Sequence, residues 1–399
     1  MTSKIMKVLI IGQLPKEIGG SYTTGAANVI YELGKQSPEG ITYYTYGTNI
    51  SDFSAKKAST YHNQYIGYSF NVFRIILYFL LNPIITIKHL FHYRYVDHQN
   101  IFRFAFYEDN IRDAIKKVTP DIIHVNSIEN LSAVRFALGN NRIPVLLTCH
   151  GIFYRGDVDD VVNRDRTLGN IAMADSYSGL TQESLKEYET ILGIPKHRVT
   201  VIPNGVDCKK FYFSPIDRER LRKQYGASRS CIVFITVASV QKRKGQLDFL
   251  KILSNLNVDY QYWIIGKGND EETMYKYCID NCLEHKVKFF GYISSNELYK
   301  FYSAADVYAH SSWKEGQALS ELEASATGLR VIVNRAIKGT IASDISSEDY
   351  FILNFEDVQL DLLMLWLNNN NLSRKSKNTF DWSVIASRYS SLYHKMLNM

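Results

Sequence analysis

Two glutamates beside a short apolar strand are the residues in this sequence best placed for polar chemistry. Glu315 lies in a polar loop after the apolar run Val307–Ala309, and Glu323 follows after seven intervening residues, inside a helix predicted to start near Ala318. The first N–H groups of a helix have no partner within it, and the helix dipole makes that end positive. We therefore expect this turn to bind a diphosphate or a sugar hydroxyl.

A cluster of cations follows another apolar strand. The run Lys242-Arg243-Lys244-Gly245 comes after the segment Ile232–Val237 and precedes a predicted helix. Cations at such a strand end can neutralise a diphosphate leaving group, where negative charge develops as its bond to carbon breaks. Three adjacent cations are also common on solvated surfaces, so the run by itself leaves both interpretations open.

The first half of the sequence offers a glycine loop and a histidine after predicted strands. Gly19 and Gly20 permit close approach of the backbone to a phosphate or a sugar, although their spacing is not that of a dinucleotide fingerprint. His150 comes just after the predicted strand Val145–Thr148. A plain turn for the glycines and a capping role for His150 are the alternatives. His124 falls within a predicted strand, and we expect it to be structural.

These residues need a scaffold, and the apolar pattern of the chain predicts two parallel sheets. Strands that are apolar throughout and separated by helices indicate parallel sheets covered on both faces. The strands predicted in the first half are Lys7–Ile11, Ile41–Tyr46, Asp121–Val125, Val145–Thr148 and Val199–Ile202. Those predicted in the second half are Ile232–Val237, Tyr260–Ile265, Val287–Phe290, Val307–Ala309 and Val331–Val333.

The alternation of strands and helices restarts after the turn Pro203-Asn204-Gly205. This restart predicts two doubly wound α/β domains with a cleft between them. Ligands in such sheets bind beyond the carboxyl ends of the strands, so the loops described above are the expected site.

Composition and charge exclude several classes of protein. Of the 399 residues, 46% are hydrophobic and 22% are charged, which is typical of a folded chain rather than a disordered one. The net charge of +6 suits an anionic small molecule or membrane surface, and without clustered basic motifs it does not indicate nucleic acid. The 5 scattered cysteines indicate free thiols in a reducing compartment, so we expect a cytoplasmic protein.

The order of these motifs resembles that of the family-4 retaining glycosyltransferases. Glu315 and Glu323, preceded by Ala305-Asp306 and followed by Ala326-Thr327-Gly328, look like the E-x7-E motif of that family. The resemblance covers nearly the whole chain and is weakest between Ser51 and Asn110.

The resemblance implies the α/β fold called GT-B, in which two Rossmann-like, doubly wound domains face a central cleft and a C-terminal helix crosses back to the first domain. We accordingly expect an acceptor-side domain at residues 1–205 and a nucleotide-sugar-binding domain at 206–378. The returning helix is expected at 379–399.

The resemblance also implies roles for individual residues. In the family, the first glutamate contacts hydroxyls of the donor sugar and the second contacts the ribose, which assigns these roles to Glu315 and Glu323. Lys244 matches a lysine that holds the donor phosphates, whereas Ser239 stands where the family has an arginine, so Arg243 is the expected substitute. The catalytic residues so implied are Glu315, His150, Lys244 and Arg243. The donor-binding residues so implied are Gly19, Gly20, Ser239, Asn204, Gly316, Gln317, Ala318, Leu319 and Glu323.

The implied reaction is transfer of a sugar from a nucleotide sugar, which we expect to be a UDP-sugar, with retention of the anomeric configuration. The expected acceptor is a glycan or a lipid-linked molecule, as in cell-surface polysaccharide synthesis. No cofactor or metal is expected, because cations and a helix terminus can replace a metal at the diphosphate. Two alternatives stay open. One is a nucleotide-sugar 2-epimerase, which would need further acid–base residues, and the other is a non-catalytic nucleotide-sugar-binding partner of a glycosyltransferase.

One segment departs from the strand–helix alternation. Phe73–Arg103 is rich in aliphatic and aromatic residues, carries four Lys or Arg against the single acidic residue Asp97, and is interrupted by Asn82-Pro83. Its apolar core, Ile75–Ile87, is too short to span a bilayer. Residues 73–103 are therefore either a pair of helices covering the N-terminal sheet or an interfacial insert lying on an anionic membrane, such as the inner face of the cell membrane.

Overall fold

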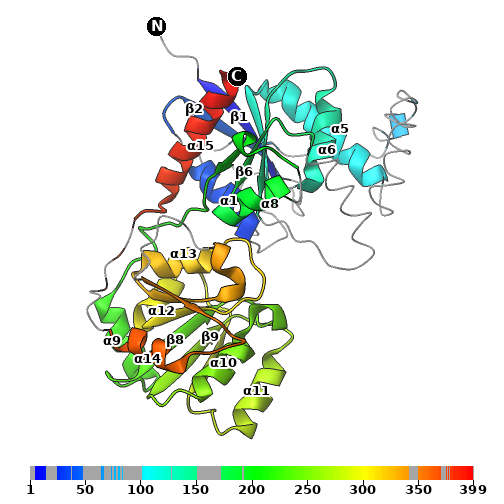
Figure 1. The fold of residues 1–399 in the computed structure, drawn as a ribbon. Coiled ribbons are helices and arrows are strands. Elements are labelled where there is room, and N and C mark those ends of the chain that lie inside the picture. The colour runs from blue at the N-terminus through cyan, green and yellow to red at the C-terminus, as the bar shows by residue number, and fades with distance from the viewer. Residues whose placement is uncertain are drawn as a thin grey trace. The chain divides into compact units, whose positions relative to one another are not determined.

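The computed structural model describes residues 5–14, 25–36, 38–47, 64–66, 101–126, 128–150, 172–190, 193–340, 349–369 and 378–398, with a few isolated positions between them. Its contacts divide into two compact units. The N-terminal unit comprises Met1–Ile202 with Ile385–Met399, and the C-terminal unit comprises Pro203–Val384. Each unit is built on one sheet whose paired strands are all parallel (Figure 1).

The sheet of the N-terminal unit has seven strands among the described residues. In spatial order they are β3 (Gln64–Ile66), β2 (Ile41–Gly47), β1 (Met6–Gly12), β4 (Ile122–Val125), β5 (Val145–Cys149), β6 (Ser176–Gly179) and β7 (Val199–Val201). The α-helices that the structure describes in this unit are α1 (Gly25–Lys35), α5 (Ile101–Val118), α6 (Ile128–Leu138), α8 (Gln182–Thr190) and, from the end of the chain, α15 (Trp382–Leu397).

Helices cover both faces of this sheet. α5, α6 and α8 pack on the face to which Ile123 and Val125 contribute. Side chains alternate along a strand, so His124 points to the opposite face, where α15 packs. His124 Nδ1 lies 2.8 Å from the Tyr393 hydroxyl of α15, and Nε2 lies 2.7 Å from Thr148 Oγ1. The expected return of the C-terminal helix to the first domain is thus confirmed, and His124 is structural because both of its ring nitrogens are occupied.

The sheet of the C-terminal unit has six strands in the part of the chain that the structure describes. In spatial order they are β10 (Val287–Gly291), β9 (Tyr260–Ile265), β8 (Ile232–Val237), β11 (Val307–His310), β12 (Arg330–Asn334) and β13 (Tyr350–Leu353). Its α-helices are α9 (Pro215–Gln224), α10 (Gln246–Ser254), α11 (Glu271–Asp280), α12 (Leu298–Ala304), α13 (Leu319–Ala326) and α14 (Leu360–Asn368). α9, α12 and α13 contribute to the core on one face of the sheet, and α10, α11 and α14 to the core on the other.

In both sheets, successive strands are first added on one side of the first strand and then on its other side. Chain order runs outward from β1 to β3 on one side and from β4 to β7 on the other, and the same reversal separates β8 from β11. This order defines a doubly wound fold, whose ligands bind at the point of reversal, beyond the carboxyl ends of the strands. The predicted fold class, two Rossmann-like sheets with a returning helix, is confirmed.

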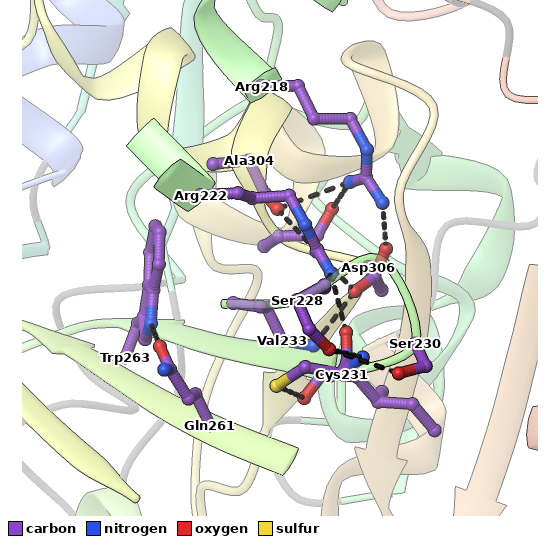
Figure 2. Close-up of polar contacts among 12 residues, drawn as sticks. Arg218, Arg222, Ser228, Ser230, Cys231, Val233, Gln261, Trp263, Ala304 and Asp306 are labelled. Carbon is purple, nitrogen blue, oxygen red and sulfur yellow. Dashed lines mark hydrogen bonds and ion pairs between the residues drawn. The ribbon is translucent and has the colours of Figure 1, made fainter. Parts of the chain in front are cut away.

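The opposite end of the C-terminal sheet is fixed by Asp306, the acidic residue before β11. Figure 2 shows its carboxylate between two guanidinium groups, with Arg218 Nη2 at 2.5 Å and Arg222 Nη1 at 2.8 Å, while the Val233 N–H donates to it at 2.8 Å. Burial alone raises the pKa of Asp306, but the two arginines hold it below its ordinary value. Both arginines also donate to the Ala304 carbonyl at the end of α12, so this cluster is structural.

All ten predicted strands are present, each within one or two residues of its observed ends. Three further strands among the described residues were not predicted. β6 has the sequence Ser-Tyr-Ser-Gly and is buried without being apolar, and β3 has only three residues. β13 is a short edge strand whose Ile352 side chain is exposed. Segment 73–103 lies largely outside the described residues, and Gly19 and Gly20 lie wholly outside them.

Candidate functional site

The loops after β8 and β11 meet at the reversal point of the C-terminal sheet. Lys244 ends the short 3-10 helix η3 (Lys242–Lys244) after β8, and Glu315 lies in the loop after β11. Lys244 Nζ forms an ion pair with Glu315 Oε2. Arg243 Nη1 lies 3.5 Å from the same oxygen. The cation cluster and the first glutamate, far apart in the sequence, therefore form one site.

Backbone contacts hold these two loops together. The Trp313 N–H donates to the Arg243 carbonyl at 2.9 Å, and Ser311 Oγ donates to the Lys244 carbonyl at 2.7 Å. Gly245 adopts φ +66°, and a Cβ at this position would lie 2.2 Å from the Ser311 carbonyl oxygen. Only glycine permits this approach, which fixes the position of Lys244 relative to Glu315.

The Glu315 carboxylate is kept ionised by its neighbours. Burial raises its pKa, but the charge and hydrogen bond of Lys244, with smaller contributions from His310 and Arg243, bring the pKa below its ordinary value. All of its described contacts, including Ser312 Oγ at 3.5 Å, fall on Oε2. Oε1 is therefore available to accept hydrogen bonds from a ligand.

The start of α13 presents unused donors next to Glu315. Its N-cap, Ala318, supplies no capping side chain. The preceding Gln317 is buried, and its Oε1 accepts from the Asn204 N–H at 2.7 Å. Gln317 Nε2 and Asn204 Oδ1 are buried polar atoms without a hydrogen-bond partner in the described part of the chain. Buried polar atoms are rarely left unpaired, so a bound ligand is the natural partner for them.

Glu323 lies on α13 in a less polar environment than Glu315. Its Oε2 accepts a hydrogen bond from the Tyr302 hydroxyl at 2.9 Å. Burial raises the pKa of Glu323 to about 7, against the opposing effects of this hydrogen bond and of Lys210. The second glutamate of the motif therefore keeps its proton to a higher pH than an ordinary glutamate does.

In the N-terminal unit, His150 pairs with a residue that the sequence analysis missed. His150 follows β5 and Asn126 follows the adjacent strand β4, so both lie at the carboxyl edge of the sheet. His150 Nε2 lies 3.2 Å from Asn126 Oδ1, and Asn126 Nδ2 is buried without a partner among the described residues. Burial lowers the pKa of His150 to about 4, so its imidazole is neutral at pH 7.

Two further predicted site residues, Arg243 and Ser239, are exposed at the surface. Arg243 is largely exposed and donates to the Lys314 carbonyl at 2.5 Å. Ser239 is exposed, and its carbonyl accepts from Gln246 Nε2 at 2.9 Å. No group of three or more His, Cys, Asp or Glu side chains that could hold a metal occurs within the described ranges. None of the described helices combines the length and hydropathy needed to cross a bilayer.

Two models of known protein families match the chain, one in each half. Residues 217–378 match the family model described as glycosyl transferases group 1, and residues 57–210 match the one described as glycosyltransferase family 4. The chain belongs to glycosyltransferase family 4. The resemblance seen in the Glu315 to Glu323 motif is thus confirmed at the level of the family.

Individual relatives of this family-4 chain are distant. The alpha-monoglucosyldiacylglycerol synthase of Acholeplasma laidlawii is 24% identical over 58% of this chain and 63% of the relative. The UDP-Gal:alpha-D-GlcNAc-diphosphoundecaprenol alpha-1,3-galactosyltransferase of Escherichia coli is 27% identical over 66% of this chain and 70% of the relative. Among solved structures, the Anabaena protein HepE in complex with UDP matches with a TM-score of 0.72 and 16% identity over 98% of this chain and 100% of HepE. The last similarity shows the shared GT-B fold.

Proposed function

We propose that this protein is a retaining hexosyltransferase that moves a sugar from a UDP-sugar to a glycan or lipid-linked acceptor. The observation that carries the proposal is the Lys244–Glu315 pair at the reversal point of the C-terminal sheet. It places a cation suited to a diphosphate beside a carboxylate suited to sugar hydroxyls. The names of the two relatives include diacylglycerol and diphosphoundecaprenol, and the HepE structure contains UDP, which supports these choices of acceptor and donor.

Each residue of the site is assigned one task. Lys244, with Arg243, stabilises the departing diphosphate, and backbone N–H groups between Gly316 and Leu319 bind the phosphate and the sugar. Glu315 accepts hydrogen bonds from the sugar hydroxyls, and Glu323 accepts them from the ribose. The further donor-binding assignments are Gly19, Gly20, Ser239, Asn204, Gln317 and Ala318. His150, with its neutral imidazole, is proposed as a catalytic residue that faces the donor sugar.

The proposed reaction keeps the sugar's configuration by attack on the face from which the leaving group departs. The bond between the anomeric carbon and the diphosphate oxygen breaks, and the acceptor oxygen forms a bond to the same carbon. The acceptor proton passes to the departing diphosphate oxygen. Lys244 and the start of α13 supply the positive charge that the diphosphate requires, so we propose that no metal takes part. The proposed location is the cytoplasm or the inner face of the cell membrane, in cell-surface polysaccharide synthesis.

A donor screen tests this proposal. UDP-glucose, UDP-galactose, GDP-mannose and ADP-glucose are each added, in EDTA, to wild type, Glu315→Ala and Lys244→Ala, and thermal stabilisation and slow donor hydrolysis are measured. We expect one sugar nucleotide to stabilise the wild type and to be hydrolysed slowly. Glu315→Ala should weaken its binding by at least about tenfold through the loss of charge-assisted hydrogen bonds to the sugar. Lys244→Ala should weaken binding of both the sugar nucleotide and the free nucleoside diphosphate.

Lys242→Ala is the matched control, because Lys242 belongs to the same run and is exposed without an ion pair among the described contacts. It should bind and hydrolyse the donor as the wild type does. If no sugar nucleotide binds the wild type, the proposed function is wrong. Binding without any turnover would instead favour a non-catalytic nucleotide-sugar-binding protein.

A further inference from the structure

Asn126 is a buried polar residue at the carboxyl edge of the N-terminal sheet, directly after β4. It lies at the reversal point of this sheet, because β4 pairs with β1 on one side and with β5 on the other. Ligands of doubly wound sheets bind at this point. Asn126 is 5% exposed, so its amide group must find hydrogen-bond partners in the protein or on a ligand rather than in bulk water.

The main chain of β1 fixes the position of Asn126. The Asn126 N–H donates to the Ile11 carbonyl at 2.9 Å. Gly12, the last residue of β1, leaves room beside it, because a Cβ at Gly12 would lie 3.3 Å from Asn126 Cβ and 2.3 Å from Ile30 Cδ1. Asn126 is thus held against β1 by close contacts, and its side-chain amide is left for other partners.

The amide oxygen of Asn126 determines which nitrogen of His150 carries a hydrogen. Asn126 Oδ1 lies 3.2 Å from His150 Nε2. An amide oxygen accepts but cannot donate, and the imidazole of His150 is neutral, so its single hydrogen is on Nε2. Nδ1 is then a hydrogen-bond acceptor. It has no hydrogen bond in the part of the chain that the structure describes.

The two side chains together leave one donor and one acceptor for a ligand. Asn126 Nδ2 is buried and has no hydrogen-bond partner among the described residues, and His150 Nδ1 supplies the acceptor. Both groups are uncharged, so they offer a phosphate no counter-charge. A hydroxyl group is uncharged and can both donate and accept, and a sugar carries several of them. The pair therefore suits sugar hydroxyls better than it suits a diphosphate.

We propose that Asn126 binds a hydroxyl oxygen of the donor sugar through Nδ2. Through Oδ1 it also positions His150, so that Nδ1 of the ring accepts from a hydroxyl of the same sugar. This inference rests on the proposed function, in which His150 faces the donor sugar. It predicts that Asn126 contributes to binding of the sugar nucleotide and not to binding of the free nucleoside diphosphate.

Deoxy analogues of the donor test this contact. The probe is the UDP-sugar, UDP-glucose or UDP-galactose, that binds the wild type in the donor screen, together with its 2-, 3-, 4- and 6-deoxy analogues and UDP. We expect Asn126→Ala to weaken binding of the UDP-sugar by about fivefold, the cost of about one hydrogen bond, while its Kd for UDP changes by less than about twofold. The loss should be smallest for the analogue that lacks the contacted hydroxyl, because the substitution then removes a contact that is already absent.

Asn110→Ala is the matched control, because Asn110 is also a buried asparagine of this unit, 8% exposed, but lies in the middle of α5. It should bind the UDP-sugar and its analogues as the wild type does. Unchanged UDP-sugar binding by Asn126→Ala would overturn the inference. An equal loss for every deoxy analogue, or a parallel loss of UDP and UDP-sugar binding, would show a structural role and would overturn it as well.

A second measurement needs no variant. In wild type with 15N-labelled histidine, the His150 resonances should show the hydrogen on Nε2, and the Nδ1 resonance should shift on addition of the UDP-sugar but not of UDP. A hydrogen on Nδ1, or equal shifts with both ligands, would contradict the assignment. A wild type that binds UDP but no sugar nucleotide would instead overturn the proposed function itself.

Discussion

Three glutamates of α13 and its preceding loop have different surroundings and therefore different chemistry. Glu315 is paired with a lysine and stays ionised. Glu321 accepts from a histidine and a tyrosine in the protein interior. Glu323 has one tyrosine hydroxyl as its described hydrogen-bond partner, and burial raises its pKa to about 7. Identical side chains, placed by one loop and one short helix, are thus suited to an anionic, a structural and a protonatable role.

The raised pKa of Glu323 predicts how its replacement changes stability with pH. Between its unfolded value of 4.5 and the folded value of about 7, the folded state binds more protons at this site than the unfolded state. This group's contribution to the free energy of unfolding therefore falls as pH rises through that window. Glu323→Gln removes the titration, so its Tm relative to wild type should rise between pH 5 and pH 8.

Glu315→Gln is the matched control for that experiment, because the pKa of Glu315 is lowered and its titration lies below pH 5. Its Tm difference from wild type should stay nearly constant from pH 5 to pH 8. A Glu323→Gln melting profile that runs parallel to wild type over the same range would contradict the assignment.

The loops at the carboxyl edge of the C-terminal sheet depend on close backbone contacts. Gly266 and Gly268 follow β9, and a Cβ at either position would lie 2.0 Å from the carbonyl oxygen of Ala238 or Val240. Gly245 makes the corresponding approach to Ser311. These glycines let the loops after β9, β8 and β11, which are adjacent in the sheet, pack without intervening side chains. This packing sets the position of the lysine and arginine side chains after β8.

Gly245→Ala tests this packing against a matched glycine. Gly226 has nearly the same φ, +69°, but nothing lies within 4 Å of a Cβ built there. Gly226→Ala should therefore cost about 1 kcal/mol for the left-handed backbone alone. Gly245→Ala should cost more and should also weaken donor binding, because the Ser311 carbonyl must move. Urea unfolding and UDP-glucose titration measure both effects, and equal values for the two variants would show that the contact is unimportant.

The strands and the motif were predictable because each rests on a local pattern. The strand Ile232–Val237 is apolar throughout, and the glutamate motif is recognisable by its spacing together with the strand before it and the glycine after it. β6 was missed because its buried serines form hydrogen bonds in place of apolar contacts, as Ser178 Oγ does with Thr148 at 2.5 Å. The contact between His310 and Glu321 was also missed, because it depends on how α13 packs beside β11.

The chain as a whole combines two doubly wound sheets with one segment that departs from the strand–helix alternation. Segment 73–103 is basic, aromatic and apolar. It falls within the match to the family-4 model at residues 57–210. Relatives of the chain are named for lipid-containing molecules. These observations support the proposal that the segment binds an anionic membrane surface.

Charge reversal tests membrane binding. Lys88→Glu with Arg94→Glu should reduce co-sedimentation with phosphatidylglycerol vesicles by at least about tenfold at low salt, since each basic residue near such a surface contributes about 1 kcal/mol. The control, Lys223→Glu with Lys276→Glu, makes the same change in net charge at exposed positions on α9 and α11. Both proteins should behave alike on neutral phosphatidylcholine vesicles. Failure of the wild type to bind anionic vesicles would leave 73–103 as a cover for the N-terminal sheet.

The ion pair between Lys244 and Glu315 has a consequence for which molecules can occupy the site. In the empty protein each charge already has its counter-ion, so neither attracts a small ion strongly. A free phosphate would pair with Lys244 but leave the Glu315 carboxylate without a partner. A free sugar would bond to Glu315 but leave Lys244 without one. On the proposed function, only a molecule that carries both groups compensates both charges at once. The site should therefore bind the intact donor more tightly than it binds either the free diphosphate or the free sugar.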